Sequence, residues 1–196
     1  MKKTICFLLI VLLAEAAFAQ SQSRNLIVYF TLHGNQTQMM TDANSSASRT
    51  IYDGKLGGNT EIIGRMIQDK VGGDMVLIET EEKFSTEYNT VVEEGKHTKG
   101  SKYKAVKTKV DLSKYDNVFL MPDPIFDFLE KHDLSGKNIY VFSTSGGSGL
   151  MRSISQIQKA QPKATVCKNG FHVYYTRVAS AKKDVDAWLE KNYSGK

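Results

Sequence analysis

Two short polar stretches carry residue types that suit an anionic or planar ligand. In the first, Gly57-Gly58-Asn59-Thr60 stands directly before a segment with helical spacing. Backbone N–H groups, a hydroxyl and the positive end of a helix dipole, presented together, suit a phosphate group. Asn59 and Thr60 suit a plain helix cap equally well. This turn alone therefore leaves both interpretations open.

The second stretch is STSGGSGLMRS, which begins at Ser143. Its three glycines let the backbone approach a ligand without a Cβ clash. The spacing is neither Gly-x-Gly-x-x-Gly nor Gly-x-x-x-x-Gly-Lys, so it supports neither a dinucleotide fingerprint nor a Walker loop. No serine lies in a Gly-x-Ser-x-Gly context, which leaves a hydrolase nucleophile unsupported. The alternative is a tight strand-to-helix turn with no ligand.

The remaining candidates for chemistry are the four histidines and Cys167. His33, His97, His132 and His172 show no metal-ligand spacing among themselves or with Cys167. A surface or structural role is the simpler interpretation of His97 and His132. His33 and His172 are of more interest because both lie near the ends of predicted strands.

The elements that must position these residues alternate along the chain. Five apolar runs predict strands at 25–30, 75–79, 117–121, 139–143 and 165–173, and the first four are apolar enough to be covered on both faces. Helical spacing marks residues 62–67, 88–92, 125–129, 150–157 and 185–189. This alternation predicts an α/β fold with a parallel sheet and helices on both faces. Ligands bind such sheets beyond the carboxyl ends of the strands, so the loops there are the places to look for function.

The start of the chain predicts export. MKKTICFLLIVLLAEAAFAQ has two lysines, an apolar run and an Ala-Phe-Ala ending, which together indicate a secretory signal peptide over residues 1–19. The apolar run is too short to span a bilayer, so we expect an exported protein, periplasmic or secreted, without stable membrane insertion. Residues 20–196 are long enough for one α/β domain.

Composition narrows the possible partners. The formal net charge of +5 becomes +4 when residues 1–19 are removed, because two lysines and one glutamate leave with them. This mildly basic charge, without a basic stripe interleaved with aromatic residues, gives little support for nucleic-acid binding. Cys167 is the only cysteine after residue 19, so no internal disulfide is expected.

Five segments in order resemble the flavodoxin family, in particular exported bacterial flavodoxin-like proteins. They are LIVYFTL, DGKLGGNTEIIGRMI, DLSKYDNVFL, FLEKHDLSGKNIYVFSTSGGSGL and DVDAWLEK. The resemblance implies a doubly wound five-stranded parallel sheet of order 2-1-3-4-5, with FMN bound noncovalently where strands one and three diverge. It also implies an electron carrier that exchanges electrons with an unidentified redox protein.

The resemblance also implies which residues hold FMN. Five residues would surround the FMN phosphate. The turn after strand four would offer backbone donors to the pyrimidine edge of the isoalloxazine ring. The implied residues are Thr31, Leu32, His33, Asn59 and Thr60 for the phosphate, and Ser143, Thr144, Ser145, Gly146, Gly147, Ser148 and Gly149 for the ring.

The chain departs from the family pattern in two places. Members usually carry an aromatic loop after strand three, whereas here Leu120 runs through Met121 directly into Pro-Asp-Pro, so we expect that loop to be missing. Ser145 stands where the family tends to have histidine. A polar insertion over residues 33–52 splits the first strand from the first helix, and in this it resembles the exported branch of the family.

The missing loop keeps a second function class open. A flavodoxin fold with weak or no flavin binding would serve as a binding or scaffold module. A third possibility is an FMN-dependent oxidoreductase acting on a quinone or nitro group, for which the sequence shows no nicotinamide site. The electron carrier is favoured over an enzyme.

Overall fold

The computed structural model describes residues 24–36, 48–87, 89–91, 93, 106–121, 125–150 and 152–195. The signal-peptide prediction over residues 1–19 and the Pro-Asp-Pro segment at 122–124 lie outside the described residues. So do residues 37–47 of the predicted insertion.

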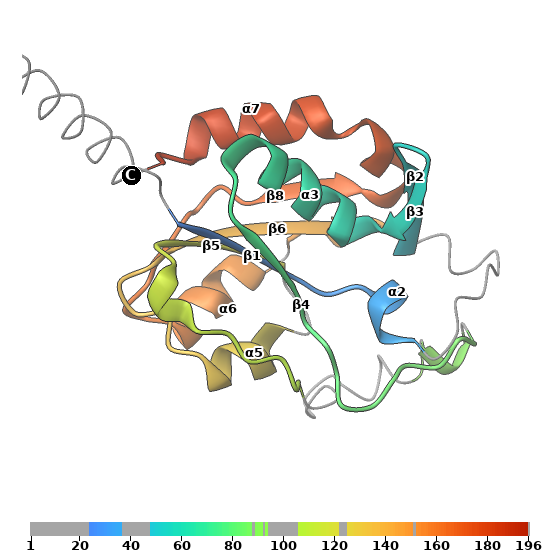
Figure 1. The fold of residues 1–196 in the computed structure, drawn as a ribbon, viewed down its shortest axis with the longest axis horizontal. Coiled ribbons are helices and arrows are strands. Elements are labelled where there is room, and N and C mark those ends of the chain that lie inside the picture. Colours follow the sequence, from blue (N-terminus) through green and yellow to red (C-terminus); the bar gives the residue numbers. More distant parts are fainter. Residues whose placement is uncertain are drawn as a thin grey trace, which may run out of the picture.

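A parallel sheet of six strands forms the centre of the described chain (Figure 1). Its strands are β1 (Asn25–Tyr29), β4 (Asp74–Leu77), β5 (Asn117–Leu120), β6 (Asn138–Ser145), β7 (Thr165–Val166) and β8 (Phe171–Tyr174). They are arranged in the order β4-β1-β5-β6-β7, and β8 also pairs with β6. Every registered pair in this sheet is parallel. The predicted α/β class with a parallel sheet is confirmed.

Helices lie on both faces of this sheet (Figure 1). The pair α3 (Asn59–Val71) and α7 (Lys182–Asn192) covers one face. The pair α5 (Ile125–Lys131) and α6 (Ser153–Ala160) covers the other. Shorter helical turns are α2 (Leu32–Asn35), η2 (Leu112–Lys114) and η3 (Tyr175–Ser180). Among the described residues, no helix is long and apolar enough to cross a bilayer.

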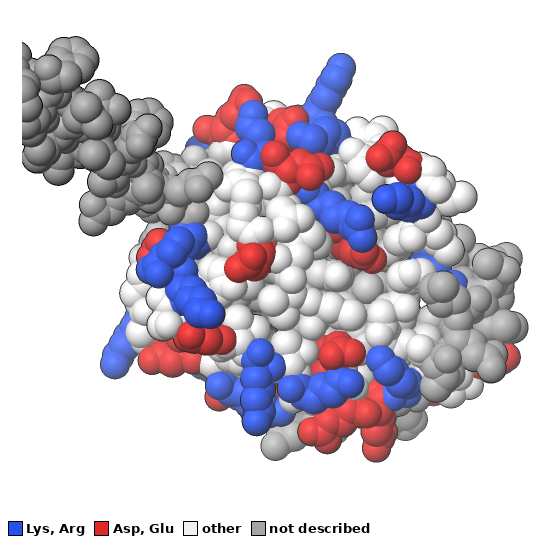
Figure 2. Space-filling view, viewed as in Figure 1, with Lys and Arg blue, Asp and Glu red and all other residues white. Residues whose placement is uncertain are grey.

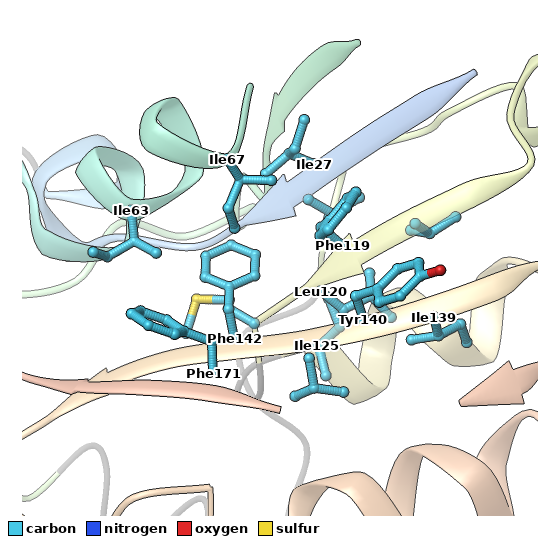
Figure 3. Packing of buried hydrophobic residues seen from close by; sticks show 14 of the residues in the cluster. Ile27, Ile63, Ile67, Phe119, Leu120, Ile125, Ile139, Tyr140, Phe142 and Phe171 are labelled. Carbon is cyan, nitrogen blue, oxygen red and sulfur yellow. The ribbon is translucent and has the colours of Figure 1, made fainter. Parts of the chain in front are cut away.

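The core fills the space between the sheet and its helices. On α3, Ile63 and Ile67 are fully buried and point toward the sheet, where Phe142 lies below them (Figure 3). The stacked rings of Phe119 and Tyr140 have centroids 4.9 Å apart, and they continue this apolar layer across β5 and β6. Burial of these side chains fixes the register of the neighbouring strands and packs α3 against the sheet.

A ladder of asparagine side chains ties together the amino ends of three strands. The Asn117 side chain donates to Asn25 Oδ1 at 3.0 Å, and the Asn138 side chain donates to Asn117 Oδ1 at 3.0 Å. Asn25 and Asn117 are each 1% exposed. These amides satisfy one another in the interior, where an unpaired polar group would cost stability.

The strand predictions differ from the structure at two places. The predicted strand at 165–173 is two strands, because β6 is eight residues long and pairs with β7 near its start and β8 near its end. Between them the chain turns outward, and Asn169 O accepts a hydrogen bond from Trp188 Nε1 at 2.8 Å. β4 is only partly buried because it lies at the edge of the sheet, so the prediction that it is covered on both faces was wrong.

The structure also contains an antiparallel hairpin that the sequence analysis missed. β2 (Arg49–Tyr52) and β3 (Lys55–Gly58) pair through a two-residue turn at Asp53-Gly54. Both turn residues have positive φ, 49° and 71°. Asp-Gly is favoured in such tight hairpin turns, so this dipeptide was the available signal. Part of the predicted polar insertion is therefore ordered secondary structure beside the start of α3.

Charges of both signs are interspersed on the face shown in Figure 2. Ion pairs such as Lys70–Glu190 and Arg24–Asp116 join exposed side chains on different elements. Exposed pairs of this kind contribute little stability because water and salt screen them. The fold therefore depends mainly on the buried apolar layers.

Candidate functional site

The carboxyl ends of the parallel strands meet at one edge of the sheet (Figure 1). The segments at this edge are α2, the β2–β3 hairpin, the start of α3 and the turn at residues 146–149. β1 and β6 are separated by β5 alone, so the two strands lie roughly 10 Å apart across the sheet. Polar residues from both predicted stretches are thus brought to the same edge.

The end of β1 and the start of α3 touch through a glycine. A Cβ built on Gly58 would overlap the Thr31 hydroxyl and lie 2.6 Å from Thr31 Cβ. Only a residue without a side chain allows this approach. Thr31 Oγ1 also accepts a hydrogen bond from His33 N at 3.2 Å, which fixes the hydroxyl beside the helix start. The insertion therefore leaves the hydroxyl of Thr31 next to the first N–H groups of α3.

Asn59 and Thr60 hold the start of α3 against its neighbours. Thr60 Oγ1 donates to the carbonyl of Phe30, and Asn59 Oδ1 accepts from Thr50 Oγ1 at 2.7 Å. Asn59 is 2% exposed and Thr60 6% exposed. Their side chains bind the protein itself, so the groups of α3 suited to an anion are its backbone N–H groups and dipole.

Charges of both signs surround the helix start. Arg49, 8% exposed, is paired in register with Gly58 and donates from Nη2 to Gln36 Oε1 at 3.0 Å. On the other side, Glu61 Oε2 accepts from Gly58 N at 3.2 Å, and Glu61 also pairs with Arg65. The Arg49 guanidinium favours an anion here, whereas the Glu61 carboxylate opposes one.

Two further groups at this edge add to the electrostatics of the site. Burial, and secondarily the charge of Glu61, raises the pKa of the Tyr29 phenol, so it stays neutral at physiological pH. His33 Nδ1 is buried and has no hydrogen-bond partner among the described residues. A buried polar atom without a partner is costly, which makes this nitrogen a natural contact for a ligand.

Ser145 organises the turn after β6. Its hydroxyl accepts from Gly149 N at 3.0 Å and from Gly147 N at 3.3 Å. Gly147 and Gly149 have φ values of 131° and 60°, which only glycine adopts without strain. The N–H groups of Gly146 and Ser148 make no hydrogen bond to any described residue, so they are the donors this turn can offer.

The contact between Ser145 and His172 fixes the imidazole tautomer. His172 lies on β8, and its Nε2 is 2.9 Å from Ser145 Oγ. A hydroxyl has two acceptor positions and one proton, and the two glycine N–H groups use both acceptor positions. The Ser145 proton must therefore go to His172 Nε2, which makes Nε2 the acceptor and places the ring proton on Nδ1.

Residues 94–192, half of the chain, match the family model described as flavodoxin. The chain belongs to the flavodoxin family. No curated protein sequence matches it. Among solved structures, a proposed flavoprotein from Bacteroides eggerthii is 22% identical, with a TM-score of 0.58 over 86% of this chain and 97% of that one. Another from Bacteroides uniformis is 17% identical, with a TM-score of 0.59 over 86% and 99%. These likenesses show a shared fold.

The structure gathers the predicted site residues of this flavodoxin-family chain into two groups at one edge. Thr31, His33, Asn59 and Thr60 lie together around the start of α3, and Leu32 packs partly buried against the core. The turn from Ser143 to Gly149 forms the second group. In the first group, the side chains of Asn59 and Thr60 make hydrogen bonds within the protein. In the second group, the N–H groups of Gly147 and Gly149 also make hydrogen bonds within the protein.

Sequence reasoning missed two residues that support the first group, Thr50 and Arg49, which come from the β2–β3 hairpin. It singled out His172, which lies on a neighbouring strand, but not the contact of His172 with Ser145. The Asp53-Gly54 turn could have revealed the hairpin. The Ser145–His172 contact spans 27 positions and depends on the register of β8, which no local pattern indicates. Among the residues that the structure describes, no cluster of three or more metal-ligating side chains occurs.

We predict that Gly58→Ala destabilises the protein by about 1–3 kcal/mol, because the new methyl group overpacks against buried Thr31. Urea denaturation measures the change. Gly57→Ala is the matched control, since the nearest atom to a Cβ there would be Ile62 Cγ1 at 3.3 Å, a much milder contact, and it should cost less than about 1 kcal/mol. Equal effects of the two substitutions would contradict the close approach of Gly58 and Thr31.

We predict that His172→Phe speeds amide hydrogen exchange at Gly147 and Gly149 by about 2- to 12-fold, because the Ser145 hydroxyl loses its acceptor and its orientation. Ser145→Ala removes the shared acceptor of both N–H groups and should speed exchange more. Nuclear magnetic resonance reports both rates. Unchanged exchange in His172→Phe alongside faster exchange in Ser145→Ala would show that His172 does not position the hydroxyl.

Proposed function

We propose that this protein binds FMN and transfers electrons outside the cytoplasm. The observation that carries the proposal is the contact of Gly58 with Thr31, which joins a hydroxyl and a helix N-terminus into one cradle for a phosphate. Membership of the flavodoxin family supports a flavin as the ligand. FMN has a phosphate at one end and a planar ring at the other, and the two polar groups at this edge match those two ends.

The residues present fit FMN in chemical type. The first N–H groups of α3, the Thr31 hydroxyl and the buried His33 Nδ1 would hold the phosphate. Gly146 and Ser148 would donate from their N–H groups to the carbonyl-bearing edge of the ring. FMN, when bound, supplies the capacity to accept and release electrons, and the protein supplies orientation and electrostatics.

The buried cation of Arg49 supports an anionic ligand. Its guanidinium is held by Gln36, which in turn donates to Ser85 O at 2.7 Å, so the cation is part of a hydrogen-bonded framework. A positive charge with little solvent screening raises the local attraction for phosphate. We propose that Arg49 offsets the repulsion that Glu61 exerts on the phosphate.

A second candidate is a binding or scaffold module with weak flavin affinity. The observation that favours it is that protein acceptors already occupy the N–H groups of Gly58, Gly147 and Gly149. Fewer donors remain for a flavin. An FMN-dependent oxidoreductase is a third possibility, and it would need an additional site for its substrate.

We further propose the finer features of fold and location. β7 and β8 together take the place of the family's fifth strand, so the sheet corresponds to the order 2-1-3-4-5 within a single domain from residue 20 to residue 196. The lysines and apolar run of residues 1–19 support cleavage of a secretory signal peptide. We expect mass spectrometry of the protein recovered from outside the cytoplasm to find Gln20 as its first residue. A chain that keeps residue 1 and stays in the cytoplasm would overturn this.

A titration of residues 20–196 with FMN and with riboflavin tests the FMN proposal. We expect saturable quenching of flavin fluorescence, tighter for FMN because riboflavin lacks the phosphate. Thr31→Val removes one hydroxyl with little change of shape. It should weaken FMN about 10- to 150-fold, the range for a hydrogen bond to a charged group, and leave riboflavin unchanged.

Thr108→Val is the matched control, because the Thr108 hydroxyl donates to Leu77 O at 3.1 Å on an edge segment outside both groups. It should leave both affinities unchanged. If FMN shows no saturation up to about a millimolar, where binding is worth only about −4 kcal/mol, the proposal fails and the binding-module candidate takes its place.

A further inference from the structure

Two tyrosines, one exposed and one half-buried, border the turn that would hold the flavin ring. Tyr174 ends β8 and is paired in register with Ser145, the last residue of β6. Tyr175 follows it and begins η3. Both residues therefore lie at the carboxyl edge of the sheet, beside the turn at residues 146–149.

The two rings form one aromatic surface. Their centroids are 5.0 Å apart and their planes are tilted by 31°. Such offset geometry is favourable for aromatic pairs. Tyr174 is 42% exposed, and among the large apolar side chains that the structure describes only Ile51, Leu56 and Tyr174 reach such exposure. Neither phenol makes a hydrogen bond to a described residue.

The Tyr175 ring lies beside the turn. A Cβ built on Gly146 would lie 3.6 Å from Tyr175 Cε1, in ordinary van der Waals contact, so Gly146 places no side chain against that edge of the ring. The η3 segment that Tyr175 begins also contacts α3 and β2. The tyrosine pair thus borders the Gly-rich turn, and the η3 segment that follows it lies beside α3 and the β2–β3 hairpin.

Side chains along β8 alternate between buried and more exposed positions, and Tyr174 takes an exposed position in this pattern. Phe171 and Val173 are buried, and the Phe171 ring lies 5.5 Å from that of Trp188 on α7. His172 and Tyr174 point to the opposite face, where His172 meets Ser145. The strand that fixes the turn through His172 therefore also presents an aromatic ring at the same edge.

We propose that Tyr174 and Tyr175 form the aromatic platform that contacts the isoalloxazine ring. This inference rests on the proposed FMN binding. We expect the aromatic loop that family members usually carry after their third strand to be missing here, and the tyrosine pair supplies aromatic surface from the last strand instead. Flavin and phenol rings stack by the same dispersion and quadrupole forces that hold bases on aromatic side chains.

The test compares FMN and riboflavin binding in wild type and in Tyr174→Leu and Tyr175→Leu. Each substitution should weaken FMN and riboflavin by the same factor, about 5- to 150-fold, because both ligands carry the same ring. This pattern differs from that of Thr31→Val, which acts on FMN alone. Bound flavin should also fluoresce more strongly in the leucine variants, because an adjacent phenol quenches the excited ring.

Conservative and distant variants complete the design. Tyr174→Phe and Tyr175→Phe keep the ring and should bind within about twofold of wild type, a change below 0.5 kcal/mol. Tyr115→Leu is the matched control, because Tyr115 lies before β5 at the amino edge, where its hydroxyl donates to Asp74. Circular dichroism confirms that each variant is folded.

The outcomes separate the two proposals. If wild type binds neither flavin, the proposed function fails and the platform fails with it. If wild type binds FMN and both leucine variants bind as tightly, the platform is overturned while the proposed function stands. If the phenylalanine variants lose as much affinity as the leucine variants, the phenol hydroxyls rather than the rings make the contact, and the platform is also overturned.

Discussion

The contact between Gly58 and Thr31 is the constraint on which the α3 end of the candidate site depends. The two residues are separated by 27 positions and by an insertion, yet the backbone at Gly58 lies against the Thr31 side chain. The Thr60 hydroxyl bonded to the Phe30 carbonyl joins the same two segments from the other side. Together these contacts dock the N-terminus of α3 on the end of β1. The β2–β3 hairpin can then occupy the insertion without moving the helix away.

Much of the fold follows from local sequence patterns. Apolar runs located β1, β5 and β6 to within about two residues, and helical spacing located α3, α5, α6 and α7. The break between β7 and β8 had a signal that the strand prediction did not use, because Asn169-Gly170 is a dipeptide typical of turns. The eight-residue length of β6 and the Trp188–Asn169 hydrogen bond stabilise that break, and both belong to the tertiary structure.

The site was less predictable than the fold for a physical reason. Sequence placed Asn59 and Thr60 at a helix start, which is correct, but it could not say whether their side chains face a ligand or the protein. The answer depends on Thr50 and Phe30, which reach them from other segments. In the same way, glycine spacing located the turn at residues 146–149, whereas the partner of Ser145 is a histidine on another strand.

The distribution of satisfied and unsatisfied polar groups favours a small ligand. Most donors at this edge are bound within the protein, so the backbone around them is already ordered before a ligand arrives, and binding loses less conformational entropy. Besides the N–H groups that begin α3, the exceptions among the described residues are His33 Nδ1, which is buried without a partner there, and the N–H groups of Gly146 and Ser148. They belong to the two groups at β1 and β6, strands that lie roughly 10 Å apart because β5 alone separates them. One elongated molecule with a polar atom at each end can satisfy both groups together.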